Sequence, residues 1–179
     1  MDERLRADSE HELIIYSDGA SRGNPGPAGI GAVILDENER VVAEISAGVG
    51  VATNNEAEYL ALAKALETAR EIGARRVRVY VDSELVAKQL SGQYAVKSDR
   101  LRPLVARVQR LRQGFDSFRV KHVRRDMNAR ADGLANMGID AALGPRGQVE
   151  QPRGQDTEQG AEAVDRHGPA PGTRGGRSI

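Results

Sequence analysis

Four carboxylates are candidates for chemistry, and the sequence pattern around the first of them, Glu58, gives a carboxylate little structural reason to be there. It precedes Leu62, Ala65 and Ala69 by four, seven and eleven residues, so in a helix it shares their apolar stripe. A glutamate is rarely buried without a partner, although a partly exposed acid near the positive start of a helix would also fit. The neighbouring Glu56 suits that second interpretation better. Glu58 is therefore a candidate functional residue.

The other three acids are Asp18, Asp82 and Asp132, and each alone has an ordinary explanation as an Asp-Gly turn, a helix cap or a surface acid. If the apolar runs at 13–18 and 76–82 are parallel neighbouring strands, Asp18 and Asp82 emerge at the same carboxyl edge, where open α/β sheets place their sites. Converging carboxylates repel one another, and a hard divalent cation removes that repulsion. Oxygen ligands in a chain without cysteine point to Mg²⁺ or Mn²⁺ rather than to zinc.

The elements that must position these acids follow from hydrophobic periodicity and helix-start signals. Thr53-Asn54-Asn55-Glu56 is a capping box and Gly73 a helix stop, while Ser83 and Asp126 are candidate caps of later helices. The order β-β-β-α-β-α-α-β-α predicts an α/β fold: a mixed five-stranded sheet, with three antiparallel strands followed by parallel strands and helices packed on it. Strands are predicted at 13–18, 29–36, 40–49, 76–82 and 118–123, and helices at 53–72, 83–90, about 101–111 and about 127–137.

Composition predicts one domain at residues 11–140 of the 179-residue chain. Residues 1–10 form a charged arm, and Gly and Pro supply 12 of the 39 residues in 141–179. Both segments are predicted to be disordered, because they cannot bury enough apolar surface to offset their ordering entropy. The absence of cysteine, of a long apolar run and of a signal peptide leads us to expect a soluble, cytoplasmic protein.

The charge of the chain is balanced overall but not locally. The formal net charge is zero, yet residues 97–130 contain eleven Lys or Arg against three Asp. These positive side chains could contact the phosphates along a nucleic acid, and a solvated helix face is an equally good explanation for them.

Four segments resemble the ribonuclease HI family in order and spacing: YSDGASRGNPGPAGIGAVI (16–34), TNNEAEYLAL (53–62), YVDSELVAKQLSG (80–92) and NARADGLAN (128–136). The resemblance covers residues 13–138. It implies the ribonuclease H-like fold and endonucleolytic hydrolysis of the RNA strand of an RNA–DNA hybrid, leaving 5′-phosphate and 3′-hydroxyl ends.

The resemblance also implies a cofactor and its ligands. Asp18, Glu58, Asp82 and Asp132 match the catalytic carboxylates of the family, which hold two Mg²⁺ ions, with Mn²⁺ as a substitute. One ion would activate the attacking water and the other would stabilise the departing 3′ oxygen. The implied partner is an RNA–DNA hybrid, with double-stranded RNA as a second candidate substrate, and the expected state is a monomer.

Substrate contacts are implied in the same way. Asn24, Asn54 and Asn55 would contact base edges or 2′-hydroxyls, the feature by which proteins distinguish RNA from DNA. The glycine-rich segment 19–31 is interpreted as a loop whose backbone could approach a nucleic-acid strand closely, or simply as a tight connection. The implied substrate-binding residues are Gly19, Ser21, Asn24, Thr53, Asn54, Asn55, Arg124 and Arg125.

The chain departs from the best-known bacterial pattern at three places, and so resembles the compact archaeal and actinobacterial-type branch of the family. The segment 123–132 is too short for a histidine-containing loop, so His122 is expected to be structural and Arg124 or Arg125 to take the place of that histidine. Residues 93–102 are too few for a basic protrusion. Glu84 replaces a common glutamine.

Two other classes of protein compete with this interpretation. Integrases, transposases and junction resolvases also use carboxylate clusters, but they generally lack a TNNxAE segment paired with a Gly-Asn-Pro-Gly loop. A non-catalytic hybrid-binding module would be expected to have lost a carboxylate, and this chain keeps all four.

Overall fold

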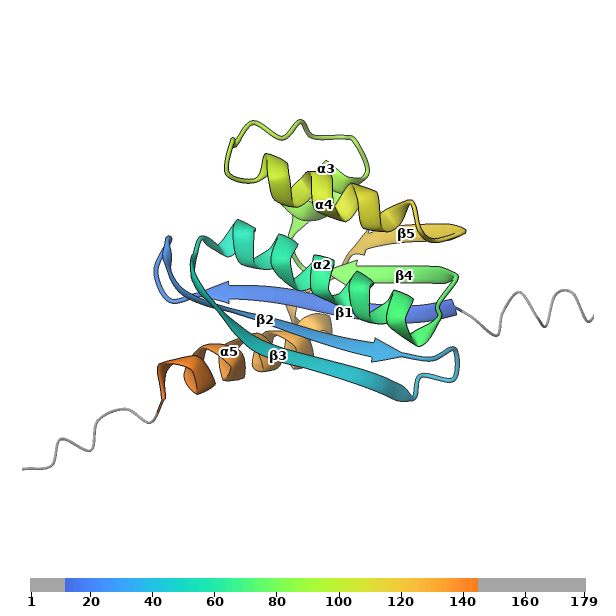
Figure 1. Cartoon of the computed structure of the whole chain (residues 1–179), viewed down its shortest axis with the longest axis horizontal. Coiled ribbons are helices and arrows are strands. Elements are labelled where there is room, and N and C mark those ends of the chain that lie inside the picture. Colours follow the sequence, from blue (N-terminus) through green and yellow to red (C-terminus); the bar gives the residue numbers. More distant parts are fainter. Residues whose placement is uncertain (1–11, 145–179) are drawn as a thin grey trace, which may run out of the picture. The chain divides into compact units, whose positions relative to one another are not determined.

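The computed structural model describes residues 12–144, which form a five-stranded sheet with helices on both faces (Figure 1). The strand order is β3-β2-β1-β4-β5. The β1–β2 and β2–β3 pairs are antiparallel, whereas β1–β4 and β4–β5 are parallel. This confirms the predicted fold and order of elements. The elements are β1 (Glu12–Ser21), β2 (Gly26–Leu35), β3 (Val41–Ala52), α2 (Asn54–Ile72), β4 (Arg76–Val81), α3 (Glu84–Leu90), α4 (Arg102–Arg112), β5 (Ser117–His122), the 3-10 turn η1 (Arg125–Asn128) and α5 (Ala129–Leu143).

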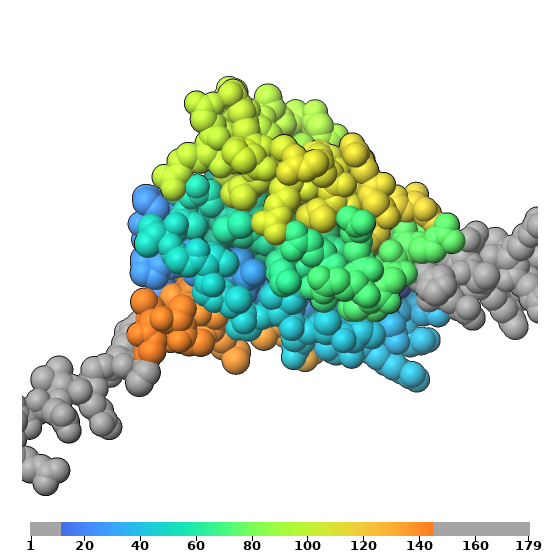
Figure 2. Space-filling model, in the orientation of Figure 1, coloured from blue at the N-terminus to red at the C-terminus, as the bar shows by residue number. Residues whose placement is uncertain are grey.

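The main core lies between the sheet and helix α2, with α3 and α4 completing it. Alternate residues of β1 and β4, such as Ile15 and Val79, meet Leu62 and Leu66 of α2, and all four are almost fully buried. In Figure 2 the side chains of α2 and α4 leave the strands beneath them largely out of view. Each fully buried aliphatic side chain of this kind contributes roughly 1.5–3 kcal/mol. The core therefore fixes α2, and with it Glu58, against β1.

Helix α2 begins and ends as its sequence predicts. The Thr53 hydroxyl accepts a hydrogen bond from the Glu56 N–H at 3.2 Å, and the Glu56 carboxylate accepts one from the Thr53 N–H at 2.7 Å. Gly73 closes the helix with a φ of 96°, a conformation that glycine adopts at little energetic cost. The capping box and the glycine stop are both confirmed.

The glycine-rich segment 19–31 is not a loop, and that expectation is corrected. Its first three residues belong to β1 and its last six to β2, so only residues 22–25 connect the strands. The glycines serve helix packing: a Cβ at Gly29 would lie 2.3 Å from the Ala135 carbonyl oxygen, and one at Gly31 would lie 2.1 Å from the Ala131 carbonyl oxygen. Their absent side chains let α5 lie directly on β2.

Helix α5 differs from its predicted bounds of about 127–137. Residues 125–128 form the 3-10 turn instead, and the predicted cap Asp126 is exposed and pairs with Arg124 at 3.1 Å. The helix also passes the expected domain boundary at 140 and ends at Leu143, because Ala142 packs where Gly48 leaves room. Residues 141–143 therefore belong to the helix rather than to the predicted tail. The predicted arm at 1–10 and the tail from 145 onward lie outside the described residues.

None of the helices within residues 12–144 combines the length and the apolar character that a membrane crossing requires.

Candidate active site

Strands β1 and β4 bring two of the predicted carboxylates to one edge of the sheet. Their parallel ladder ends at the pair Tyr16–Tyr80, and Asp18 and Asp82 each follow two residues later. The parallel pairing on which the sequence argument depended is confirmed. One carboxylate oxygen each from Asp18, Asp82 and Glu58 lies within 4.8 Å of the others.

Helix α2 supplies Glu58 through an unusually close approach to β1. A Cβ at Gly19 would lie 2.1 Å from the backbone carbon of Ala57, so only glycine allows this contact. The approach leaves Glu58 only 8% exposed beside Asp18, which is 5% exposed. Gly19, proposed from the sequence as a substrate contact, thus has a structural role as well.

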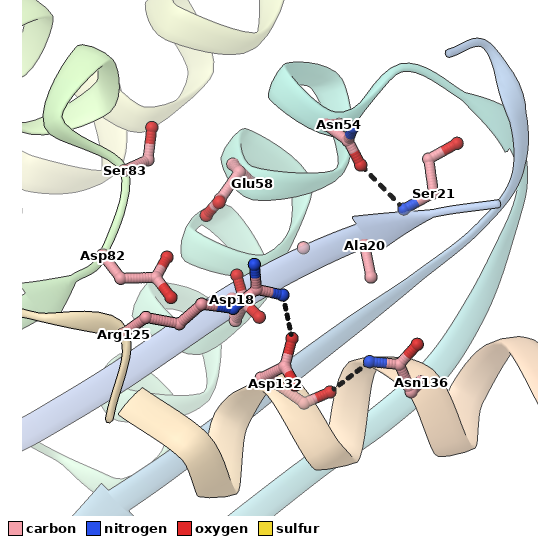
Figure 3. Close-up of a pocket in the computed structure, with 11 residues that line it drawn as sticks. Asp18, Ala20, Ser21, Asn54, Glu58, Asp82, Ser83, Arg125, Asp132 and Asn136 are labelled. Atoms are coloured by element: carbon pink, nitrogen blue, oxygen red, sulfur yellow. Dashed lines mark hydrogen bonds and ion pairs between the residues drawn. The ribbon is translucent and has the colours of Figure 1, made fainter. Parts of the chain in front are cut away.

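Asp132 reaches the same site from α5. It is not one of the three closest acids, but it lines their cavity of about 520 Å³. Figure 3 shows Arg125 extending to Asp132, with 3.2 Å between Nη2 and Oδ1. All four predicted carboxylates therefore line one cavity.

The electrostatics of the site are unfavourable without a cation. Burial, followed by the charges of Asp82 and Asp132, raises the pKa of Asp18 to about 7. Burial, followed by the charges of Asp18 and Asp82, raises the pKa of Glu58 well above its ordinary range. The Glu58 Oε2 atom is buried and has no hydrogen-bond partner. Oxygen donors crowded in this way fit a hard divalent cation, which would satisfy the free oxygen and offset the repulsion.

Four of the predicted substrate-binding residues line this cavity: Gly19, Ser21, Asn54 and Arg125. The Asn54 side-chain oxygen accepts a hydrogen bond from the Ser21 N–H at 3.0 Å, drawn in Figure 3. This bond commits Oδ1 and leaves the Nδ2 group as the donor available to a ligand.

The other predicted contacts lie elsewhere. The Asn24 side-chain oxygen accepts a hydrogen bond from the Asn54 N–H at 3.1 Å and so joins the β1–β2 turn to α2. The Thr53 hydroxyl caps the start of the same helix. Asn55 lines a second cavity, together with Gln89 and other residues. Arg124 is outside the main cavity.

Arg124 and Arg125, which the sequence left as alternatives for a cation near the site, lie in different places. Only Arg125 lines the cavity, since Arg124 pairs with Asp126. His122 lies outside the cavity lining, and its Nε2 is 3.1 Å from the backbone oxygen of Asp82. His122 thus joins the end of β5 to the chain that carries Asp82, in keeping with the structural role predicted for it.

The basic segment 97–130 is partly neutralised by acids from other elements. Arg100 pairs with Glu56 at 2.9 Å and Arg107 with Glu67 at 2.6 Å. Arg130 likewise pairs with Glu44. The local positive excess counted from the sequence therefore overstates the charge available to a polyanion.

Three polar residues near the carboxylates were not assigned to the site from the sequence. Ser83 and Asn136 line the cavity, and the Asn136 amide donates to the backbone oxygen of Asp132 at 3.0 Å. Helical spacing could have found Asn136, which follows Asp132 by four residues. Asn128 is buried beneath the site and precedes Asp132 by the same interval.

Known proteins share this sequence and this arrangement. A family model described as reverse transcriptase-like matches residues 16–138. The ribonuclease HI of Halobacterium salinarum is 46% identical over 138 residues, which cover 77% of this chain and 69% of that protein. A Mycobacterium tuberculosis protein described as bifunctional is 43% identical over 132 residues, and this chain spans only 36% of its length.

Solved structures agree with these sequence matches. The crystal structure of RNase H1 from Halobacterium salinarum superposes with a TM-score of 0.71 at 45% identity, covering 73% of this chain and 98% of that one. An RNase H1 isolated from compost, solved in complex with an RNA/DNA hybrid, gives a TM-score of 0.71 at 44% identity, covering 74% of this chain and 99% of that one.

Proposed function

The chain belongs to the ribonuclease H family, and from this premise we propose that it is an endoribonuclease that hydrolyses the RNA strand of RNA–DNA hybrids, leaving 5′-phosphate and 3′-hydroxyl ends. The observation that carries the proposal is the convergence of Asp18, Glu58 and Asp82 within 4.8 Å, with Asp132 in the same cavity. A related RNase H1 solved with an RNA/DNA hybrid supports the choice of substrate.

In this proposal the four carboxylates hold two Mg²⁺ ions, for which Mn²⁺ can substitute. The crowding of Asp18 and Glu58, and the unpartnered Glu58 oxygen, support a cation at this position. When bound, such ions lower the pKa of water and stabilise charge on the attacking and leaving oxygens of a phosphodiester. Asp18 and Asp82 would be the central ligands, with Glu58 toward the leaving group and Asp132 toward the nucleophile.

The remaining residues of the cavity would bind and orient the RNA. The Asn54 Nδ2 group, left available by the bond between Oδ1 and Ser21, would donate to a 2′-hydroxyl or a base edge. Arg125 would approach the phosphate next to the scissile bond, because its guanidinium already lies beside Asp132. Arginine suits this role through its planar, doubly donating geometry. It cannot serve as a proton donor, since it stays charged in proteins.

A labelled RNA–DNA hybrid tests the proposal directly. We expect cleavage with Mg²⁺ or Mn²⁺ and none with EDTA, and products that carry 5′-phosphate and 3′-hydroxyl ends. Asp18→Asn and Asp82→Asn should abolish cleavage while leaving the circular dichroism spectrum unchanged. Near-normal turnover in either variant would reject the assignment of the site.

Parallel reactions define the substrate class. Cleavage of duplex RNA at a comparable rate would widen the class, and cleavage of duplex DNA in preference to the hybrid would overturn the proposal. A monomeric state and a cytoplasmic location stay predictions, which light scattering and cell fractionation would test.

A further inference from the structure

Asn128 is a buried polar residue at the junction of η1 and α5 that the proposed reaction does not use. It is 1% exposed, and its Nδ2 group donates a hydrogen bond to the backbone oxygen of Ser17 at 3.0 Å. The bond joins two segments separated by 111 residues in the sequence. It therefore fixes a tertiary distance rather than a local turn.

The side chain makes this bond in place of the local cap that asparagine often provides. Asparagine at the start of a helix usually caps it with its own side chain, which stabilises the helix by about 1 kcal/mol. Helix α5 begins at Asn128 without any side-chain cap. The Asn128 Oδ1 atom is also buried with no partner, which is costly for a polar group. The amide thus neither caps the helix nor satisfies both of its polar atoms. This indicates a role other than helix stability.

The two ends of this bond are next to two of the proposed ligands. Ser17 directly precedes Asp18 in β1, just past the point where the β1–β4 ladder ends at Tyr16–Tyr80. The Asn128 amide thus donates to a β1 carbonyl that lies just beyond the last β1 residue paired with β4. On the other side, Asp132 follows Asn128 by four residues, about one helical turn, so the two lie on neighbouring turns of one helix face.

We propose that Asn128 is a positioning residue: its hydrogen bond to Ser17 sets the distance between Asp132 and Asp18, and so holds these carboxylates in place for a shared divalent cation. The role in catalysis rests on the proposed function, whereas the hydrogen bond between Asn128 and Ser17 does not depend on which substrate is bound. Removal of a residue that orients a metal ligand without contacting the metal typically lowers metal affinity or activity about 10- to 100-fold.

A second tether of α5 offers a matched control. The Ser46 hydroxyl donates to the backbone oxygen of Leu134 at 2.7 Å, so it also holds α5 to the sheet through one side-chain-to-backbone bond. That bond reaches β3 rather than β1, and neither Ser46 nor Leu134 lines the cavity of the carboxylates. Ser46→Ala therefore removes a comparable anchor without disturbing the path from Asp18 to Asp132.

The experiment compares Asn128→Ala, the isosteric Asn128→Asp and Ser46→Ala with the unaltered protein. Hybrid cleavage is measured at a temperature where circular dichroism shows every variant folded, and Mn²⁺ binding is measured by calorimetry without substrate. We expect both Asn128 variants to lower kcat and to weaken Mn²⁺ binding about tenfold or more, with KM changed less than about twofold. Ser46→Ala should lower the melting temperature yet leave kcat and Mn²⁺ affinity near their original values.

Equal losses of kcat in Ser46→Ala and the Asn128 variants would overturn the proposal, because general docking of α5 would then explain the effect. Unchanged Mn²⁺ affinity in folded Asn128 variants would also overturn it. If Asn128→Ala does not fold, Asn128→Ser, which keeps a shorter hydroxyl donor, carries the comparison with an intermediate loss expected. A failure of the unaltered protein to cleave any hybrid would reject the proposed function, while the Mn²⁺ titration would still test the role of Asn128.

Discussion

Replacement of Asp18 by asparagine should stabilise the metal-free protein at alkaline pH while abolishing cleavage. Asp18 is 5% exposed and lies against Glu58 and Asp82. Without a cation, its negative charge is both desolvated and repelled. The amide is nearly isosteric with the carboxylate but carries no charge, so the substitution removes the repulsion, lowers the desolvation penalty and keeps the packing.

The size and direction of the effect follow from the pKa of Asp18, which rises from 3.8 to about 7 on folding. The folded state then binds a proton more tightly than the unfolded state, so stability is lost as pH rises from about 4 through about 7. Each pKa unit corresponds to about 1.36 kcal/mol, so the full shift sets a ceiling of roughly 4 kcal/mol. A buried amide retains part of the desolvation penalty, and we expect a gain of about 2 kcal/mol above pH 8. That gain should raise the melting temperature by roughly 4–8 °C for a domain of this size.

Thermal melts with EDTA at pH 5 and pH 8.5 measure this effect. The unaltered protein should be the less stable at pH 8.5, and Asp18→Asn should lose much of that pH dependence. The exposed Asp99, whose pair with Arg102 is on the surface, provides the control: Asp99→Asn should move stability by less than about 1 kcal/mol at either pH. Added Mg²⁺ should stabilise the unaltered protein more than Asp18→Asn. A variant that is clearly less stable than the unaltered protein at pH 8.5 in EDTA would refute the reasoning, since the carboxylate would then be held by favourable contacts.

Three further outcomes are expected. Arg125→Ala should lower turnover or raise KM about tenfold, whereas Arg124→Ala, outside the cavity, should change either by less than about threefold in steady-state cleavage of a hybrid. His122→Ala should lower the free energy of unfolding by about 1 kcal/mol in chemical denaturation, because its contact with the Asp82 backbone is lost, and turnover should be nearly unchanged. A large loss of turnover without a loss of stability would contradict the structural role of His122. Gly31→Ala should destabilise the fold by about 1–3 kcal/mol in the same assay, because the new Cβ would lie 2.1 Å from the Ala131 carbonyl oxygen, and turnover should fall as α5 shifts.

Three of the carboxylates could be predicted from the sequence, one because it conflicts with its local pattern and two because the order of the strands brings them together. Glu58 falls on an apolar helical stripe, and Asp18 and Asp82 end strands that the chain order makes parallel neighbours. The first signal depends on helical periodicity, which is local, and the second on the order of strands and helices, from which the parallel pairing of β1 and β4 can be inferred. The arrangement of these three acids in the structure is the one that this argument requires.

The glycine-rich segment shows why other features could not be predicted. Glycine marks a turn, and it equally marks a strand against which another backbone packs closely. At Gly31 the deciding neighbour is Ala131, a hundred residues away in the sequence, and nothing local indicates that contact. The sequence left Arg124 and Arg125 as alternatives for a similar reason, because the 3-10 turn before α5 determines which of the two side chains lines the cavity.

These long-range contacts share one feature: strands β1 and β2 are the surface on which α2 and α5, the two helices that carry Glu58 and Asp132, are packed. Gly19 of β1 lets α2 bring Glu58 forward, and Gly31 of β2 lets α5 lie close enough to present Asp132. The carbonyl of Ser17 in β1 receives the amide that begins α5. Asp18 itself extends from β1, so a displacement of that strand would alter its distance to both helices at once. Four carboxylates can be held together against their mutual repulsion only by a scaffold that resists such displacement, and β1, paired on both sides at the centre of the sheet, is the strand best placed to do so.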